Sequence, residues 1–294
     1  MKSRLITKFK GHKGSIYCIE SGDDNHFFTA GSEGIIAEWH LDEPEEGKLM
    51  ARVPGVVYTM MRLQENLLLA GTAHGHVQVI DIAERKEIRL LQYHSSPVFR
   101  LAWWPGKNLL FSLAGDGTIQ VYDAALNPVY AMRPVSGKLR SIAFSETNFY
   151  IGSPDGMILQ FSDSFECIGS YAAHEPGFGV NALWLHQGLL YSGSRDARII
   201  ISDPVTGKLL QTVPAHNYAI YAIKPVPGKE NIIATASRDK TVKLWNTDTL
   251  EPLQRLDATL DGHSNSVNDL VWLNEKTLVT TGDDRIAIAW EITV

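Results

Sequence analysis

The chain has 294 residues, of which 44% are hydrophobic and 20% are charged, and its formal net charge is −6. This composition is typical of a globular protein that buries a large core, and it argues against a disordered chain. The negative balance gives no general attraction to phosphate backbones or anionic lipids, so neither nucleic acid nor a membrane surface is the expected partner.

The two cysteines, Cys18 and Cys167, lie far apart and have no paired spacing of the kind that zinc sites or disulfide frameworks show. We therefore expect two free thiols. The first nine residues alternate charged and apolar types without the apolar core of a signal peptide, and no segment is long and apolar enough to span a bilayer. Together these features predict a cytoplasmic protein.

A spare strand is the first predicted element. Residues 3–9 alternate in character and stand ahead of the first repeat, whereas the last repeat ends after its third strand, at residues 291–294. If the spare strand pairs with that last repeat, it supplies the missing fourth strand and covers a sheet edge that would otherwise stay open. The sequence therefore predicts that the two ends of the chain pair with each other.

A repeated unit follows along the rest of the chain. Its plainest copy, residues 215–246, reads as three short strands separated by turns, with a fourth strand at 253–256. Each copy has a turn position, usually acidic, six residues before the end of its third strand. These positions are Glu33, His74, Asp116, Asp155, Asp196, Asp239 and Asp284. Successive positions are 41, 42, 39, 41, 43 and 45 residues apart, which predicts an all-β, seven-bladed β-propeller of four-stranded antiparallel blades, with residues 1–294 as a single domain.

Two further positions recur in these units: a Gly-His position before the first strand, and an aromatic position that ends the third. The first reads Gly11-His12, His94, His174, Ala215-His216 and Gly262-His263. The second reads Trp39-His40, Ile80-Asp81, Tyr122-Asp123, Phe161-Ser162, Ser202-Asp203, Trp245-Asn246 and Trp290-Glu291. At these positions the chain resembles the WD-repeat family over its whole length, although the literal Trp-Asp pair never occurs. The resemblance implies the propeller fold and a scaffold that holds a protein partner.

The resemblance also implies a buried hydrogen-bond chain in each blade, running from the aromatic residue through Ser or Thr and His to the turn acid. The sets are His12, Thr29, Glu33 and Trp39; His94, Ser112, Asp116 and Tyr122; His174, Ser192 and Asp196; His216, Thr235, Asp239 and Trp245; and His263, Thr280, Asp284 and Trp290. Such sets could be read as catalytic triads. A catalytic group occurs once, in a cleft, whereas these sets are copied with the fold, so we predict a structural role and no catalytic residue.

Three blades depart from the pattern. The second has Pro54-Gly55 at the Gly-His position, the fourth lacks the histidine and has Ile151 in place of Ser or Thr, and the fifth has Ser202 in place of the aromatic residue. These blades are expected to rely more on apolar packing. His74 and His76 are close in sequence, but a metal site needs a third or fourth ligand, so we predict a turn there and no metal.

No phosphate-binding loop, nucleophile elbow or zinc-protease motif occurs in the sequence. Glycines beside the turn acids, as in residues 115–117 and 154–156, are explained by the positive φ of a tight turn. The sequence therefore predicts no cofactor and no enzymatic activity. The alternative is a propeller enzyme, or a binder of a small ligand or metal, that works in the central channel.

The resemblance implies that the residue after the first apolar residue of each innermost strand faces the mouth of the channel, on what we call the top face. Those residues are Tyr17, Tyr58, Phe99, Arg140, Asn181, Tyr221 and Asn268, with Lys138, Arg195 and Arg238 expected nearby. Tyrosine and arginine supply much of the binding energy at protein interfaces. We predict that a peptide binds there through an apolar or aromatic anchor next to acidic or phosphorylated residues. Alternatively, the tyrosines pack between blades. The oligomeric state stays open.

Overall fold

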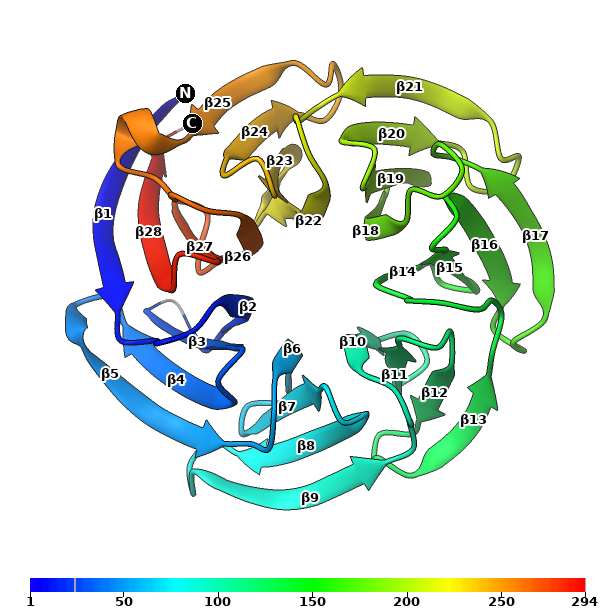
Figure 1. The fold of residues 1–294 in the computed structure, drawn as a ribbon. Coiled ribbons are helices and arrows are strands. Elements are labelled where there is room, and N and C mark those ends of the chain that lie inside the picture. The colour runs from blue at the N-terminus through cyan, green and yellow to red at the C-terminus, as the bar shows by residue number, and fades with distance from the viewer. Residues whose placement is uncertain (24, 294) are drawn as a thin grey trace. The chain divides into compact units, whose positions relative to one another are not determined.

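The computed structural model describes residues 1–23 and 25–293. Apart from the short 3-10 helix η1 (Ala258–Leu260), the regular elements of these residues are all β-strands (Figure 1). The strands form seven four-stranded sheets, as the repeat predicts, and each sheet is called a blade below. The chain divides into two compact units, residues 1–98 with 224–294 and residues 99–223. The prediction that residues 1–294 form a single domain stays a prediction.

Three blades lie entirely within the first unit. Blade one consists of β2 (Ile16–Ser21), β3 (His26–Gly31), β4 (Ile35–His40) and β5 (Glu43–Arg52). Blade two consists of β6 (Val57–Leu63), β7 (Leu67–Thr72), β8 (His76–Asp81) and β9 (Lys86–Gln92). Blade seven consists of β26 (Val267–Trp272), β27 (Thr277–Gly282), β28 (Ile286–Thr293) and β1 (Lys2–Lys10).

The second unit holds blades three to five. Blade three consists of β10 (Val98–Trp104), β11 (Leu109–Ala114), β12 (Ile119–Tyr122) and β13 (Pro128–Met132). Blade four consists of β14 (Ser141–Phe144), β15 (Asn148–Gly152), β16 (Met157–Ser162) and β17 (Cys167–Ala172). Blade five consists of β18 (Val180–His186), β19 (Leu189–Ser194), β20 (Arg198–Ser202) and β21 (Leu209–Pro214). Blade six is β22 (Ile220–Val226), β23 (Lys229–Ser237), β24 (Val242–Asn246) and β25 (Pro252–Leu256). In each blade the third strand is largely buried, whereas the outer strand is exposed over much of its length.

The N-terminal strand completes the last blade, as predicted. β1 pairs antiparallel with β28 from Lys2 opposite Thr293 to Lys10 opposite Ile286, with one irregularity between Leu5 and Thr7. Figure 1 shows β1 lying along the outer side of β28. Phe9, in the same strand, is buried against residues of blades one and seven, so β1 also joins these two blades.

The turn before each third strand contains a residue in the left-handed conformation. In blades one to four this residue is glycine, with φ between 68° and 89° at Gly34, Gly75, Gly117 and Gly156. In blades five to seven the same place is taken by Ala197, Lys240 and Arg285, with φ of 67°, 73° and 69°. In four blades glycine adopts the left-handed conformation without steric strain. In the other three blades the turn residue has a side chain, which makes this conformation less favourable.

Replacing Arg285 by glycine is therefore expected to raise the free energy of unfolding by about 0.5–1 kcal/mol, because relief of the left-handed strain outweighs the added freedom of the unfolded chain. Chemical denaturation of the variant measures this. Gly117→Ala is the opposite control: its methyl group would collide with the Val135 carbonyl oxygen, so it should destabilise. A loss of stability in Arg285→Gly would contradict the assignment of strain.

Candidate functional site

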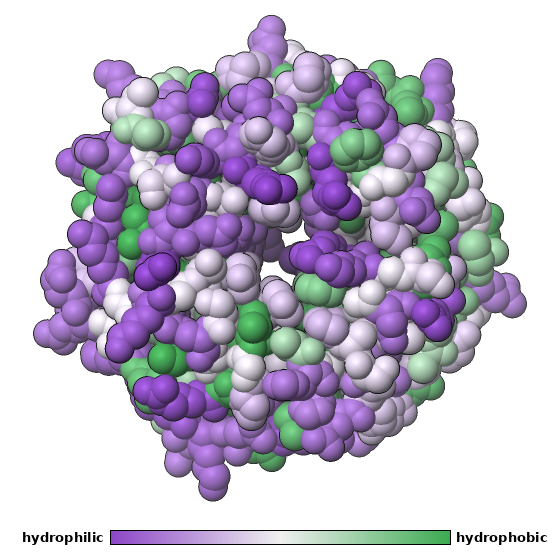
Figure 2. Space-filling view, viewed as in Figure 1, coloured by the Kyte–Doolittle hydropathy of each residue, from purple (hydrophilic) through white to green (hydrophobic). Residues whose placement is uncertain are grey.

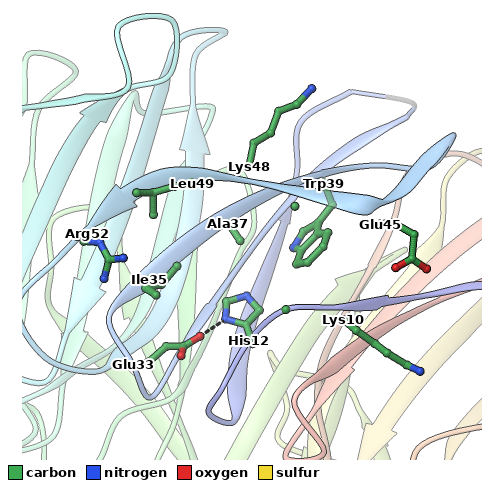
Figure 3. Close-up of a pocket in the computed structure, with 12 residues that line it drawn as sticks. Lys10, His12, Glu33, Ile35, Ala37, Trp39, Glu45, Lys48, Leu49 and Arg52 are labelled. Carbon is green, nitrogen blue, oxygen red and sulfur yellow. Dashed lines mark hydrogen bonds and ion pairs between the residues drawn. The ribbon is translucent and has the colours of Figure 1, made fainter.

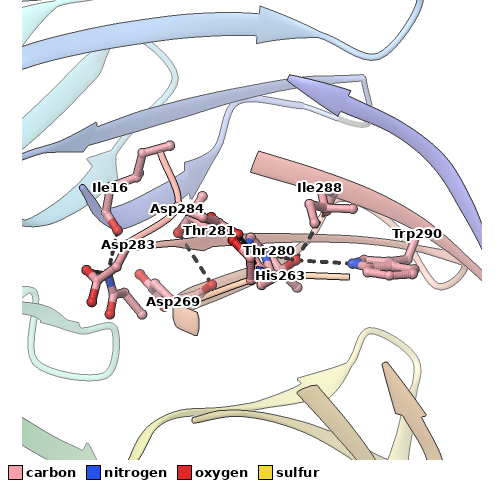
Figure 4. A network of polar contacts seen from close by, with 11 residues as sticks. Ile16, His263, Asp269, Thr280, Thr281, Asp283, Asp284, Ile288 and Trp290 are labelled. Carbon is pink, nitrogen blue, oxygen red and sulfur yellow. Dashed lines mark hydrogen bonds and ion pairs between the residues drawn. The ribbon is translucent and has the colours of Figure 1, made fainter. Parts of the chain in front are cut away.

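Blade seven shows the hydrogen-bond chain in full (Figure 4). His263 Nδ1 lies 2.9 Å from both carboxylate oxygens of Asp284, and Nε2 lies 2.9 Å from Thr280 Oγ1. The indole Nε1 of Trp290 donates to the same Thr280 Oγ1 at 3.1 Å. Backbone N–H of Ser264 also donates to Asp284 at 2.9 Å. These hydrogen bonds thus tie the segment ahead of the blade's first strand to its second and third strands and to the turn between them.

Blade one repeats this geometry with a longer acid. His12 Nδ1 lies 2.5 Å from Glu33 Oε1 and Nε2 lies 2.7 Å from Thr29 Oγ1, to which Trp39 Nε1 donates at 2.7 Å. Burial lowers the pKa of His12, and the hydrogen bond to Glu33 opposes that shift. A neutral ring with one donor and one acceptor nitrogen therefore suits this position.

Blade five keeps His174 2.9 Å from Asp196 and 2.8 Å from Ser192. Where an aromatic residue is expected it has Ser202, whose Oγ lies 2.8 Å from the hydroxyl of Tyr171 on β17, the outer strand of blade four. Burial raises the pKa of Tyr171 to about 12, so the phenol keeps its proton. A serine that hydrogen-bonds to the neighbouring blade thus stands where the aromatic residue was expected, which the repeat alone did not reveal.

Blades three and six show parts of the predicted sets. In blade six Trp245 Nε1 donates to Thr235 Oγ1 at 2.9 Å. The turn acids also anchor their own turns, since Thr241 Oγ1 donates to Asp239 at 2.6 Å and Thr118 Oγ1 donates to Asp116 at 2.7 Å. In blade three Ser112 Oγ donates to the Gln120 carbonyl at 3.4 Å. The roles assigned to His94 and His216 stay predictions.

Aromatic packing takes the place of the polar set in blade four. Ile151 is fully buried, and Phe149 stacks on Phe161 with ring centroids 5.1 Å apart. Trp104 lies edge-on to Phe149 at 5.8 Å and stacks on Phe144 at 5.2 Å. This dense cluster fits the expectation that a blade without the polar chain relies on apolar contacts.

The close histidine pair lies in blade two. The rings of His74 and His76 are 6.3 Å apart. Among residues 1–23 and 25–293 no group of three or more His, Cys, Asp or Glu side chains could hold a metal ion. The predicted absence of a metal and of a cofactor stays a prediction.

Four of the predicted top-face residues share an unusual backbone position. The pairing of the first and second strands skips Tyr17, Tyr58, Asn181 and Asn268, each of which forms a β-bulge. A bulge leaves its residue outside the ladder and re-aims the side chain. Tyr17 and Tyr58, on neighbouring blades, stack with ring centroids 5.6 Å apart. Both remain partly exposed. The tyrosines thus pack between neighbouring blades, and their contact with a partner stays a prediction.

The two bulge asparagines hold neighbouring blades together. Asn181 Nδ2 donates to the carbonyl of Ile220 at 2.9 Å, and Asn268 Nδ2 donates to the carbonyl of Ile16 at 2.8 Å. In both cases the acceptor is the first apolar residue of the next blade's innermost strand. Asn268 also donates to Asp283 at 2.8 Å. Sequence reasoning missed this bridging role, although asparagine at the same place in two repeats is a signal that could have shown it.

A cation–aromatic cluster forms in the second unit, and we call Phe99, Lys138 and Arg140 the Phe99 clamp. The guanidinium carbon of Arg140 lies 4.2 Å from the centroid of the Phe99 ring, and Lys138 Nζ lies 5.6 Å from it. Phe99 is only 8% exposed, whereas Lys138 is exposed and Arg140 partly so. The ring is therefore a platform beneath two cations.

Of the other predicted top-face residues, Arg195 and Arg238 are exposed and Tyr221 is partly exposed.

The visible surface is hydrophilic in character. In the face seen in Figure 2, polar and charged side chains predominate and hydrophobic ones form small separate patches. Within the described part of the chain, no helix is long and apolar enough to cross a membrane.

Comparisons with known proteins agree with the repeat pattern. The kinesin-like protein KIF21A of Homo sapiens is 25% identical over 96% of this chain, and the nuclear distribution protein PAC1 of Arthroderma benhamiae is 27% identical over 69% of it. Shk1 kinase-binding protein 15 of Schizosaccharomyces pombe is 28% identical over 50% of the chain. The aligned regions span 18%, 38% and 42% of these relatives' own lengths.

A solved structure gives the fold. The crystal structure of the WD40 beta propeller domain of Doa1 superposes with a TM-score of 0.88, at 20% identity, and covers 99% of this chain and 97% of that one. The fold is thus the predicted seven-bladed β-propeller. The sequence profile "WD domain, G-beta repeat" matches residues 3–40, 85–123, 207–246 and 254–291, which together make up more than half of the chain. This chain belongs to the WD40 family.

Proposed function

We propose that this chain is a non-catalytic scaffold that binds a protein partner through an extended peptide segment. The segment would carry acidic or phosphorylated residues beside an apolar or aromatic anchor. One observation carries the proposal: in the Phe99 clamp, Arg140 and Lys138 lie over one aromatic ring. Membership of the WD40 family and the name of the yeast relative, a kinase-binding protein, support a role in protein binding.

The physical basis lies in how a cation on a ring is held. A guanidinium that lies over an aromatic face keeps its N–H groups at its edge, where they can meet a carboxylate or phosphate in a bidentate pair. The ring also limits the conformations of the side chain, so less freedom is lost on binding. Arg195, exposed in the same unit, adds positive charge.

The Tyr17–Tyr58 pair belongs to the first unit and offers a different chemistry. Two stacked, partly exposed phenol rings give a broad apolar surface with polar tips. Such a surface suits the apolar or aromatic anchor of a partner. The proposal assigns charge recognition to the Phe99 clamp of the second unit, and it treats the tyrosine pair as a separate apolar contact surface of the first unit. A cytoplasmic location, no bound nucleic acid and the absence of catalysis belong to the same proposal.

The test uses a fluorescein-labelled peptide that places a phosphoserine next to phenylalanine, with binding followed by fluorescence anisotropy. The double variant Lys138→Glu, Arg140→Glu should weaken binding at least about tenfold, or about 1.4 kcal/mol, because attraction becomes repulsion. Binding should also weaken as salt is added.

The matched control is Lys86→Glu with Lys208→Glu, which makes the same charge change on exposed outer strands and loops. It should bind like the wild type and melt at the same temperature. Equal binding by the wild type and the Phe99 clamp variant, both folded, would overturn the assignment of this surface.

A further inference from the structure

A crevice opens in blade one, beside the hydrogen-bond chain of His12 (Figure 3). It has a volume of about 320 Å³ and lies between β1, β4 and β5. We call it the blade-one crevice; Ile35, Ala37, Trp39 and Leu49 give it apolar walls. Lys10, Glu45, Lys48 and Arg52 stand around it. Sequence analysis did not predict it.

The irregular pairing of β5 creates this space. Glu38 pairs with Lys48, but the next pair joins His40 to Glu43, so residues 44–47 bulge out opposite Trp39 alone. Gly47 makes the crossing possible, because a Cβ there would lie 2.6 Å from the indole ring. At Gly47 the outer strand packs directly against the indole, which is only 3% exposed, and the crevice opens beside the ring. A feature that needs this many departures from a regular ladder is a built feature of blade one rather than a packing defect.

The charge around the blade-one crevice differs from that of the whole chain. The chain carries −6 overall, but three cations stand around the crevice and one of its two acids is already engaged. Glu33 accepts from Lys13 N at 3.1 Å and lies against His12. Within residues 1–23 and 25–293, the side chains of Lys10 and Arg52 make no hydrogen bond or ion pair, and Lys48 reaches only Glu43 at 3.5 Å. An incoming acidic group would therefore find unneutralised positive charge.

The shape and edges of the crevice favour an extended peptide as the occupant. A volume of about 320 Å³ is at the lower end of ligand pockets and suits one aliphatic side chain with its flanking backbone. Both bordering strands, β1 and β5, are the outer strands of their sheets, so each presents one edge of backbone N–H and C=O groups. Such edges hydrogen-bond an extended chain.

From these observations we propose that the blade-one crevice is a second peptide site, which takes a leucine-like side chain of a partner between Ile35 and Leu49. Acidic residues on either side of that leucine pair with Arg52 and Lys10. This site lies in the first unit, is built from blades one and seven, and shares no residue with the Phe99 clamp. It does not depend on the function proposed above.

The test uses a fluorescein-labelled peptide, Gly-Ser-Asp-Leu-Asp-Ser-Gly, and the full chain. Saturable binding is expected by anisotropy, and in the ¹H–¹⁵N spectrum the indole N–H of Trp39 should shift on titration. Arg52→Glu should weaken binding at least about tenfold, and so should a peptide with serine in place of leucine. Lys86→Glu, the same charge change on the outer strand of blade two, should bind as the wild type does.

Two results would overturn the proposal: no saturable binding of the peptide by the wild type, or unchanged binding by a folded Arg52→Glu variant. The Phe99 clamp variant distinguishes the two proposals. If the leucine peptide loses affinity in Lys138→Glu, Arg140→Glu but not in Arg52→Glu, the blade-one crevice is rejected while the Phe99 clamp stands. If the leucine peptide loses affinity in Arg52→Glu but not in Lys138→Glu, Arg140→Glu, the blade-one crevice is supported.

Discussion

Replacing Phe9 by alanine is expected to lower the free energy of unfolding by about 3–5 kcal/mol. Phe9 is 1% exposed and its ring meets Phe27 edge-on, with centroids 4.8 Å apart, and Trp39 at 5.6 Å. Alanine would remove most of this burial and leave a cavity between blades one and seven. Because β1 belongs to blade seven, the loss weakens the one strand that the N-terminal segment contributes to that blade.

Urea denaturation followed by circular dichroism measures this change. Ile6→Ala, on the same strand but 41% exposed, is the matched control and should cost less than about 1 kcal/mol. Deleting residues 2–10 should have a larger effect still, because it uncovers the edge of β28 and invites aggregation. If Phe9→Ala were as stable as Ile6→Ala, the strand would not be holding the two blades together.

Asp284→Ala is expected to destabilise the protein by about 1–3 kcal/mol. The substitution leaves His263 Nδ1 and the Ser264 N–H without the carboxylate that they now share. Both His263 and Asp284 side chains are almost fully buried, so water cannot readily replace the lost acceptor. Thermal melting of the variant beside the wild type gives the measurement. Asp248→Ala, an exposed acid whose side chain makes no such contact, is the control. Equal melting of Asp284→Ala and the wild type would remove the structural role assigned to the chain of hydrogen bonds.

The same carboxylates predict a loss of stability in acid. Burial acts to raise the pKa of Asp284, but the hydrogen bond and charge of His263, together with backbone hydrogen bonds from Ser264 and Ile286, hold the pKa below its ordinary value. Burial likewise acts to raise the pKa of Asp196, but His174 and backbone hydrogen bonds from Arg198 and Glu175 together lower it. A carboxyl whose pKa is lower in the folded state stabilises the protein above its unfolded pKa of about 4, and that contribution disappears as the pH falls through the folded value.

His12 acts in the same direction, at higher pH. Burial lowers its pKa from 6.5, so the folded protein prefers the neutral ring, and stability falls as the pH drops below that value. Denaturation midpoints measured from pH 7 to pH 3 should therefore fall, and fall less steeply in Asp284→Ala. A midpoint that is independent of pH over this range would contradict both assignments.

Much of the fold could be predicted from residue spacing alone. Glu33, Asp116 and Asp239 recur at nearly constant intervals because each blade needs the same turn, and a period of about 40 residues has few architectures that can satisfy it. The pairing of β1 with β28 was also predictable, since an unmatched strand at one end and a missing one at the other leave open sheet edges.

The candidate sites were less accessible to sequence reasoning. The resemblance to the WD-repeat family implied that Phe99 lies on a partner-binding surface. It did not show that the ring is buried beneath Arg140, because the orientation of a side chain depends on neighbours from another blade. The resemblance likewise implied a partner contact for Asn181, and the structure adds that its amide donates to the Ile220 carbonyl of the next blade. Whether Asn181 also contacts a partner stays a prediction.

The sequence by itself determined the number of blades, the turn acids and the pairing of the chain ends, because these follow from local periodicity and from the need to complete the last blade with a fourth strand. Only the tertiary structure decided that Ser202 contacts Tyr171 and that the irregular pairing of β5 with β4 borders the blade-one crevice. Both depend on contacts between strands that are not adjacent in sequence, or on a shift in register. Neither leaves a periodic signal in the chain.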